Sequence, residues 1–220
     1  MRKRTTIFLA HIALACAPWA QSSLADRPTL WKAQWITAPD APQRDEVVLH
    51  FRKVIELTPP PQHFYVDVSG DNQFVFHVNQ QLVGNGPSRS DLAHWGYETY
   101  DLAPFLRAGK NVLAATVWNF GTHAAIAQMS DRAGFLVHGE SGAEELADTN
   151  ASWDVEIEKG IRSLQPQVRG YYAAEPGMRM DGVTFDWTWD GDANGGDAWR
   201  KAVPLGRGSL RGETDAPNNW

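Results

Sequence analysis

Residues 65–119 read YVDVSGDNQFVFHVNQQLVGNGPSRSDLAHWGYETYDLAPFLRAGKNVLAATVWN, and this stretch decides the fold. Apolar residues recur at every second position in three of its segments, a period typical of strands that bury one face. The alternating positions are Phe64, Val66 and Val68, then Phe74, Phe76 and Val78, and then Val112, Ala114, Thr116 and Trp118. The sequence therefore predicts half-buried strands with these side chains on the core.

Turn-forming residues separate these segments. Gly70-Asp71-Asn72 predicts a turn after the first strand, and Asn79-Gln80-Gln81 predicts the turn of a hairpin. Further on, Asp101 can cap a helix, Pro104 is tolerated in a first helical turn, and Gly109 suits a left-handed helix end. We expect one short helix there, capping the end of the strands.

Short strand patterns continue on both sides of this stretch. They cover residues 47–57, 134–138, 153–157 and 168–172, and Gly-, Pro- and Asp-rich turns separate them. The sequence has no long helical periodicity and no internal repeat. Many short strands with turns between them favour an all-β protein, an antiparallel β-sandwich of the jelly-roll kind.

The first 25 residues have the features of a cleaved secretory signal. Arg2-Lys3-Arg4 is a basic start, 7–17 is a short apolar run, and Ser23-Leu24-Ala25 places small residues where a signal peptidase reads them. A lipoprotein signal that uses Cys16 is the alternative, although Ala13 stands where Leu is usual. Either signal predicts an exported protein, in the periplasm or outside the cell.

Charge and cysteine content limit the partners. The chain has a net charge of −6, and its first 25 residues hold three basic side chains and no acidic one. The exported part is therefore more acidic still, which argues against nucleic acid or an anionic membrane as partner and favours a neutral one. Cys16 is the only cysteine. After cleavage we expect no disulfide and no thiolate chemistry.

Five motifs occur in a distinctive order. They are WKAQWI (31–36), FRK (51–53), NQQLVGNGPSRSD (79–91), HWGYETYDLAPFL (94–106) and GKNVLAATVWN (109–119). In this order they closely resemble the amino-terminal β-sandwich domain of bacterial α-L-rhamnosidases of glycoside hydrolase family 78, and the hairpin with its Val-Gly end resembles galactose-binding-like modules. The resemblance implies a galactose-binding-like sandwich whose catalytic partner is a helical barrel downstream, absent from these 220 residues.

This resemblance implies an accessory role. We expect a signal at 1–25, a β-sandwich at 26–175, and a Gly-, Asp- and Trp-rich tail at 176–220 that either completes the sandwich or leads to a missing domain. The protein would be the non-catalytic, carbohydrate-binding-like part of an exported rhamnosidase-like enzyme of plant or bacterial glycan breakdown. A stand-alone carbohydrate-binding module is the alternative. An enzyme in its own right would need a pair of carboxyl groups, which nothing in the sequence pairs.

The long polar loop is the candidate sugar site. Sugar binding needs an aromatic platform and a few polar groups for hydroxyls. Residues of both kinds are Asn85, Arg89, Asp91, His94 and Trp95, with Asn119 at the end of the last strand. The partner would be a carbohydrate such as a rhamnosylated glycan. Alternatively, Arg89 and Asp91 pair to stiffen the loop, or this surface contacts the catalytic domain. Trp118 also ends the last strand and either sits at the same rim or, as its alternation with Val112 and Ala114 favours, lies in the core.

The tail contains a candidate calcium loop. Asp190, Asp192 and Asn194 stand at the first three ligand positions of an EF-hand-like loop, but Lys201 replaces its twelfth ligand. An acidic turn before a Trp is the alternative, and no other cofactor is expected. The histidines at 50, 63, 77 and 138 are expected at the surface or at sheet edges. Their spacing predicts no transition-metal site.

Overall fold

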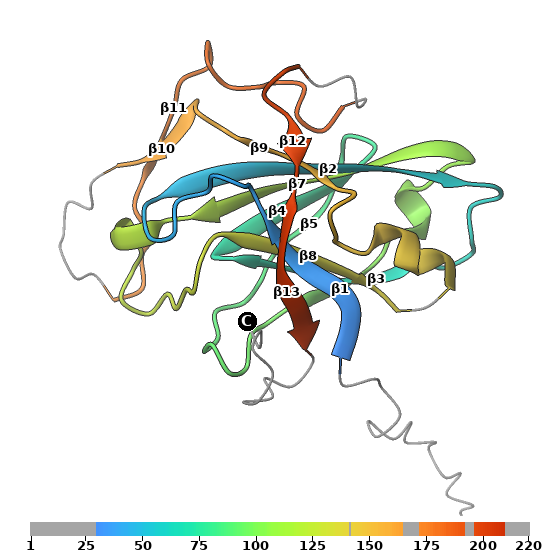
Figure 1. Cartoon of the computed structure of the whole chain (residues 1–220), viewed down its shortest axis with the longest axis horizontal. Coiled ribbons are helices and arrows are strands. Elements are labelled where there is room, and N and C mark those ends of the chain that lie inside the picture. Colours follow the sequence, from blue (N-terminus) through green and yellow to red (C-terminus); the bar gives the residue numbers. More distant parts are fainter. Residues whose placement is uncertain (1–29, 141, 165–171, 192–195, 210–220) are drawn as a thin grey trace, which may run out of the picture.

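The computed structural model describes residues 30–140, 142–164, 172–191 and 196–209, whose strands pack as two antiparallel sheets face to face (Figure 1). The first sheet has the order β13 (Val203–Ser209), β1 (Leu30–Thr37), β8 (Gly134–Gly139), β3 (Tyr65–Asp71) and β6 (Glu98–Asp101). The second has the order β12 (Arg200–Lys201), β9 (Asp154–Ile157), β2 (Val47–Leu57), β7 (Gly109–Asn119), β4 (Gln73–Val78) and β5 (Gln81–Gly86). A separate two-stranded antiparallel sheet pairs β10 (Ile161–Ser163) with β11 (Met178–Met180). The predicted all-β antiparallel sandwich is confirmed.

The core lies between the two sheets and has an aromatic centre. The alternating residues of β3 and β4 face it as predicted, and all of them are buried. Phe135 of β8 stacks on Phe51 of β2, with ring centroids 5.2 Å apart, and meets Trp153 edge-on at 5.6 Å. Because these rings come from both sheets, their contacts join the two layers.

The predicted face of β7 is wrong. Leu113, Ala115 and Val117 point into the core, whereas the set with Thr116 and Trp118 lies on the outer face of the second sheet. Almost every residue from 112 to 118 is apolar, so the local pattern cannot distinguish the two faces. The outer face is also covered, because the chain after β9 folds back over it. Trp118 is therefore half-buried on that outer face and is absent from the core.

The connections behave largely as predicted. Gly70-Asp71-Asn72 carries the chain from the first sheet to the second, and Asn79 and Gln80 have the positive φ angles, 51° and 66°, of a tight hairpin turn. The predicted helix is a single 3₁₀ turn, Ala103–Phe105, whose first N–H donates to Asp101 Oδ1 at 3.0 Å. Two more 3₁₀ helices, Gly121–His123 and Gly142–Ala147, were not predicted.

Residues 181–191, between β9 and β12, arch over the outer face of the second sheet (Figure 1). Trp189 stacks on the ring of His50 at 4.8 Å, and His77 pairs with Asp190 at 2.7 Å. His50 is fully buried, so its expected surface or edge position is wrong. The alternation of apolar residues within one strand cannot show that a segment far along the sequence will cover its outer face. Beyond it, β12 joins the second sheet and β13 the first.

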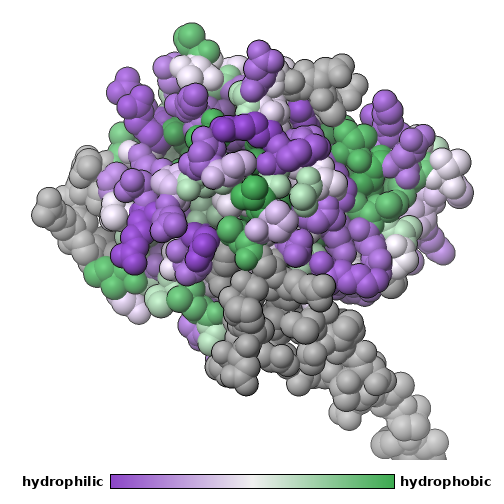
Figure 2. Space-filling model, in the orientation of Figure 1, coloured by the Kyte–Doolittle hydropathy of each residue, from purple (hydrophilic) through white to green (hydrophobic). Residues whose placement is uncertain are grey.

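One face of the molecule is largely polar. Hydrophilic side chains dominate the face shown in Figure 2, and hydrophobic ones form separate patches between them. Within the described ranges, no helix is both long and apolar enough to span a membrane. The predicted secretory signal and residues 168–171 of one predicted strand lie outside the described residues.

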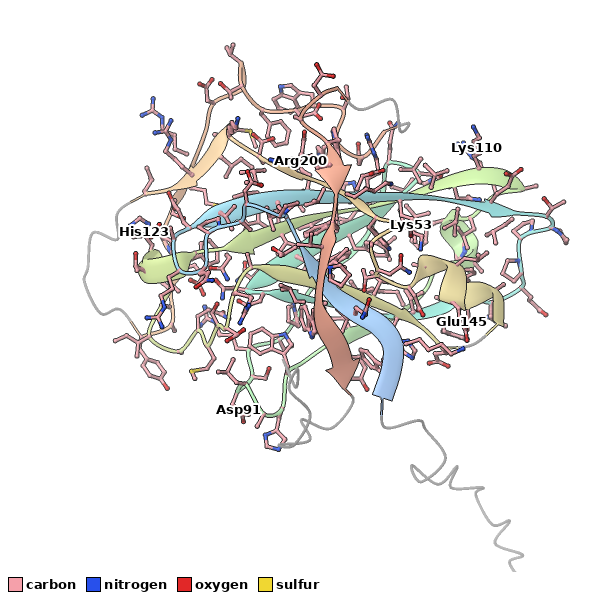
Figure 3. All side chains as sticks on the ribbon, viewed as in Figure 1. Lys53, Asp91, Lys110, His123, Glu145 and Arg200 are labelled. Carbon is pink, nitrogen blue, oxygen red and sulfur yellow. The ribbon has the colours of Figure 1, made fainter. Side chains whose placement is uncertain are left out.

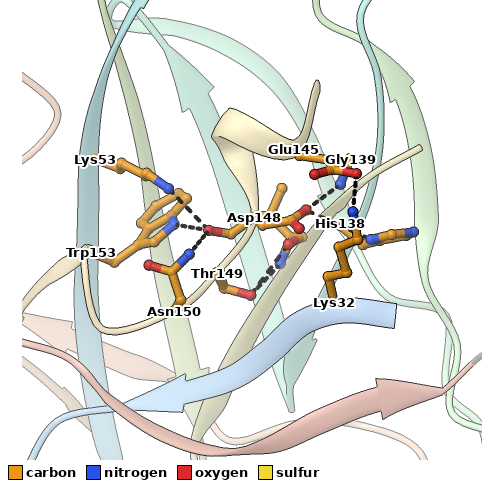
Figure 4. A network of polar contacts seen from close by, with 10 residues as sticks. Lys32, Lys53, His138, Gly139, Glu145, Asp148, Thr149, Asn150 and Trp153 are labelled. Carbon is orange, nitrogen blue, oxygen red and sulfur yellow. Dashed lines mark hydrogen bonds and ion pairs between the residues drawn. The ribbon is translucent and has the colours of Figure 1, made fainter. Parts of the chain in front are cut away.

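A polar network fastens the segment after β8 to both sheets (Figure 4). The Asp148 carbonyl accepts hydrogen bonds from Lys53 Nζ and from the indole of Trp153, each at 3.1 Å. Its carboxylate accepts from the Gly139 N–H at 2.8 Å. Burial lowers the pKa of Lys53 from 10.5 to about 8, partly opposed by the charge of Asp148.

This pKa predicts a pH dependence. Because folded Lys53 loses its proton at a lower pH than the unfolded chain does, the free energy of unfolding should rise with pH between about 8 and 10.5. Lys53→Met should lack this increment, as measured by urea unfolding across that range. Lys32→Met is the control, because the hydrogen bond to Glu145 raises the pKa of exposed Lys32. Equal pH profiles for wild type and Lys53→Met would contradict the prediction.

Candidate functional site

The outer face of the second sheet carries a hollow beside Trp118. The hollow has a volume of about 350 Å³ and lies over β4, β5 and the end of β7. Antiparallel pairing places Trp118 directly opposite Gln73, and Asn85 opposite Val75 on the next pair of strands. Since these residues share one face of one sheet, their positions are set by strand register.

The lining is neutral and combines an aromatic ring with amides. Trp118 supplies the ring, Gln73 and Asn85 supply the amides, and Pro87 and Met178 add apolar surface. None of the described residues that line it carries a charge. An indole face beside amide donors and acceptors can bind a ligand that has both an apolar face and hydroxyl groups. It offers little to an ion.

The Trp118 side chain separates this hollow from a smaller one. The second hollow, of about 100 Å³, lies toward β2 and is lined by Trp118, Met178 and Glu46 among others. The indole Nε1 is buried, and no described residue accepts a hydrogen bond from it. A buried donor without an acceptor raises the free energy of the folded state. This N–H can therefore donate a hydrogen bond to an acceptor that is not among the described residues.

A buried polar network holds the end of β7, next to Trp118. Asp71 Oδ1 accepts from the Asn72 amide at 2.6 Å and from the Asn119 amide at 3.0 Å, and Asp71 Oδ2 accepts from the Asp131 N–H at 2.8 Å. The backbone N–H of Asn72 donates to the Trp118 carbonyl at 2.7 Å. These bonds fix the position from which Trp118 projects.

The predicted loop residues divide among different roles. Arg89 pairs with Glu175 at 2.5 Å and with Gln128 at 3.1 Å, so it ties the loop to the chain after β10. Asp91 lies at the exposed tip (Figure 3) and accepts hydrogen bonds from His94. The hydrogen bond from the His94 side chain lowers the pKa of Asp91. Asp91 and His94 thus form a self-contained turn.

Two of the predicted residues help to hold the structure. Trp95 packs edge-on against Trp35 on the outer face of the first sheet, and its indole donates to Ser69 Oγ at 3.1 Å. Asn119 is buried, and its amide bonds Asp71 and Ser130. Of the predicted residues, Asn85 is the one that lines the hollow beside Trp118.

The predicted calcium ligands are only partly described. Asp190 Oδ2 is bonded to His77 Nδ1, as noted above, and helps to hold the segment over the sheet. Asp192 and Asn194 lie outside the described residues.

Sequence reasoning missed Gln73, and for Trp118 it favoured the core over the rim of the sheet. Gln73 stands on the polar side of the predicted strand 74–78, which was a usable signal. For Trp118, the pairing with Gln73 across β4 and β7 was needed, and strand register was not visible in the sequence.

Fold and hollow together define an antiparallel β-sandwich with an uncharged hollow on the outer face of its second sheet. The chain resembles part of solved glycoside hydrolase family 78 rhamnosidases. With the enzyme of Bacillus sp. GL1 it shares 26% identity and a TM-score of 0.71, covering 81% of this chain and 19% of that one. With the α-L-rhamnosidase of Dictyoglumus thermophilum it shares 19% identity and a TM-score of 0.60, covering 79% of this chain and 21% of that one.

A fungal structure gives the same fold. The α-L-rhamnosidase of Aspergillus terreus matches with 17% identity and a TM-score of 0.59 over 79% of this chain and 21% of that one. The chain thus spans about a fifth of the length of these rhamnosidases. The sequence matches no protein-family model and no curated protein.

Proposed function

We propose that this chain is a non-catalytic, carbohydrate-binding accessory domain at the amino-terminal end of an exported α-L-rhamnosidase-like glycoside hydrolase. The observation that carries the proposal is the neutral hollow in which Trp118 stands opposite Gln73 and near Asn85. The ligand is a carbohydrate, for which a rhamnosylated glycan is the first choice given the resemblance. The catalytic domain of the hydrolase is the protein partner.

Several features support this role. The hollow is large enough for a monosaccharide and holds the two kinds of group that sugars need. The basic, apolar and small-residue pattern of residues 1–25 supports export to the periplasm or the medium. Export would place the domain where polymeric glycans are degraded.

The test is a calorimetric titration of the whole chain with L-rhamnose and with a rhamnosylated glycan. Trp118→Ala should weaken sugar binding roughly tenfold, because burying about 60 Å² of indole contributes about 1.5 kcal/mol. Trp118→Phe should lose less, since it keeps a smaller platform. Circular dichroism and thermal unfolding would show that each variant is folded.

Asp91→Ala is the matched control, because Asp91 lies at the exposed tip of the long loop (Figure 3). It should bind sugar as the wild type does. If Asp91→Ala abolished binding and Trp118→Ala did not, the sugar site would lie on the long loop. If the folded wild type bound neither ligand, the sugar-binding role would be refuted, and docking to the catalytic domain would remain as the function.

A further inference from the structure

A third hollow, at the other end of the same sheet's strands β2 and β9, has a different chemistry from the two beside Trp118. It has a volume of about 370 Å³ and is lined by Arg52, Glu156, Glu158, Asp186 and Trp199 among others. It shares no described lining residue with the neutral hollow at Trp118. Its inner wall is made of ionisable side chains, which are costly to bury without a partner.

Two of these lining carboxylates converge with a buried histidine of the same sheet face. His50 of β2 and Glu156 of β9 are cross-strand partners, and Glu158 lies two residues further along the same face. One potential ligand atom from each of the three lies within 4.8 Å of the other two. All three residues are buried, with exposed fractions of 0%, 6% and 5%. Strand pairing rather than sequence spacing brings them together.

The histidine is held in a defined orientation. His50 Nδ1 lies 2.9 Å from Thr116 Oγ1, and Trp189 stacks on its ring. When Nδ1–H donates to Thr116, the lone pair of Nε2 faces Glu158 Oε2, 3.0 Å away. A hydrogen bond from the far ring nitrogen is the usual way in which a protein orients a metal-binding imidazole.

Glu156 has one carboxylate oxygen without a hydrogen-bond partner among the described residues. Its Oε1 atom is buried, and no described residue donates a hydrogen bond to it. Burial, followed by the charge of Asp186, raises the pKa of Glu156 to about 7. Arg52 faces the same carboxylate, but its guanidinium also stacks over Trp199 at 3.9 Å. Three buried or half-buried carboxylates thus face one guanidinium, with Lys159 exposed at the rim.

We propose that His50, Glu156 and Glu158, together with Asp186, bind a divalent transition-metal ion, best matched by Zn²⁺. Ligand atoms about 2.0–2.2 Å from a tetrahedral zinc ion stand roughly 3.3–3.6 Å from one another. His50 Nε2 and Glu158 Oε2, 3.0 Å apart, would need to separate only slightly to admit the ion. One imidazole with carboxylates suits Zn²⁺, whereas Ca²⁺ takes six to eight oxygen ligands. This site is independent of the proposed sugar site.

The ion would fasten the covering segment to the sheet. Asp186 belongs to the chain that arches over the second sheet, and its N–H already donates to Glu158 Oε2 at 3.2 Å. An ion shared by Asp186 and the strand residues would add a strong link between cover and sheet. Its binding should therefore appear as thermal stabilisation, without any change in the sugar titration.

The test uses the whole chain, produced without a histidine tag and stripped with a chelator. Titration with ZnCl₂ should give one equivalent bound, and zinc at about 100 times its Kd should raise Tm by about 5–10 °C. Glu156→Gln keeps the size of the side chain and removes one ligand, so it should weaken zinc binding at least tenfold.

Asp154→Asn is the control, since Asp154 lies on the same strand but pairs with Lys201. It should bind zinc as the wild type does. His50→Gln provides a second ligand variant and should also lose binding if it folds. No zinc bound by the folded wild type, equal binding by Glu156→Gln, or a preference for CaCl₂ over ZnCl₂ would overturn the proposal. If the folded wild type bound no zinc, the excess negative charge would instead be offset by a proton that Glu156 and Asp186 share.

Discussion

Phe135→Ala is expected to lower the free energy of unfolding by about 3–5 kcal/mol, the range for removing a buried aromatic ring. Phe135 is fully buried and contacts rings from both sheets, among them Phe51, Phe74 and Trp153. Its removal would leave a cavity between the layers that neither sheet can close alone. Against a total stability of roughly 5–15 kcal/mol, such a loss would remove much of the folded population at moderate urea concentrations.

Urea unfolding monitored by tryptophan fluorescence would measure this effect. Tyr172→Ala is the matched control, because it deletes an aromatic ring that is 70% exposed, and it should change stability by less than about 0.5 kcal/mol. Phe135→Leu should fall between the two, since it refills part of the space. A loss below about 1.5 kcal/mol for Phe135→Ala would mean that the layers do not share this ring as a common centre.

Local sequence pattern predicted the elements better than it predicted their surroundings. In β3 and β4 the apolar residues truly alternate, so the sequence identified both the strands and the faces that they bury. In β7 both faces are apolar, because the strand is central and covered on both sides. The pattern was therefore ambiguous, and the assignment of Thr116 and Trp118 to the core was wrong.

The same limit applies to the sites. The turn chemistry around Asn79 and the polar loop after Asn85 are local features that could be read directly. The pairing of Trp118 with Gln73, and of His50 with a carboxylate 108 residues away, depends on strand order and register. No local signal encodes these contacts, since each arises when distant segments pair or cover one another.

Asp71→Ala is expected to lower the free energy of unfolding by roughly 3–5 kcal/mol, because it removes the acceptor of two buried donors and of a third that is partly buried. The amides of Asn72 and Asn119 and the N–H of Asp131 all bond its carboxylate, which is fully buried. Without it, these groups lose an acceptor at the point where the chain passes from one sheet to the other. Thermal and urea unfolding would give the loss.

Asp71→Asn separates the role of the charge from that of the shape. The asparagine side chain keeps one oxygen that can accept from the neighbouring amides, but its NH₂ group faces a donor. The free energy of unfolding should therefore fall by about 1–3 kcal/mol. Asp131→Asn changes an exposed carboxylate beside the same network and should stay within about 0.5 kcal/mol of wild type. If the chain with Asp71→Asn folds, it should also bind sugar more weakly, because Asn72 holds the Trp118 backbone. Unchanged stability and unchanged sugar binding together would show that the network does not position the end of β7.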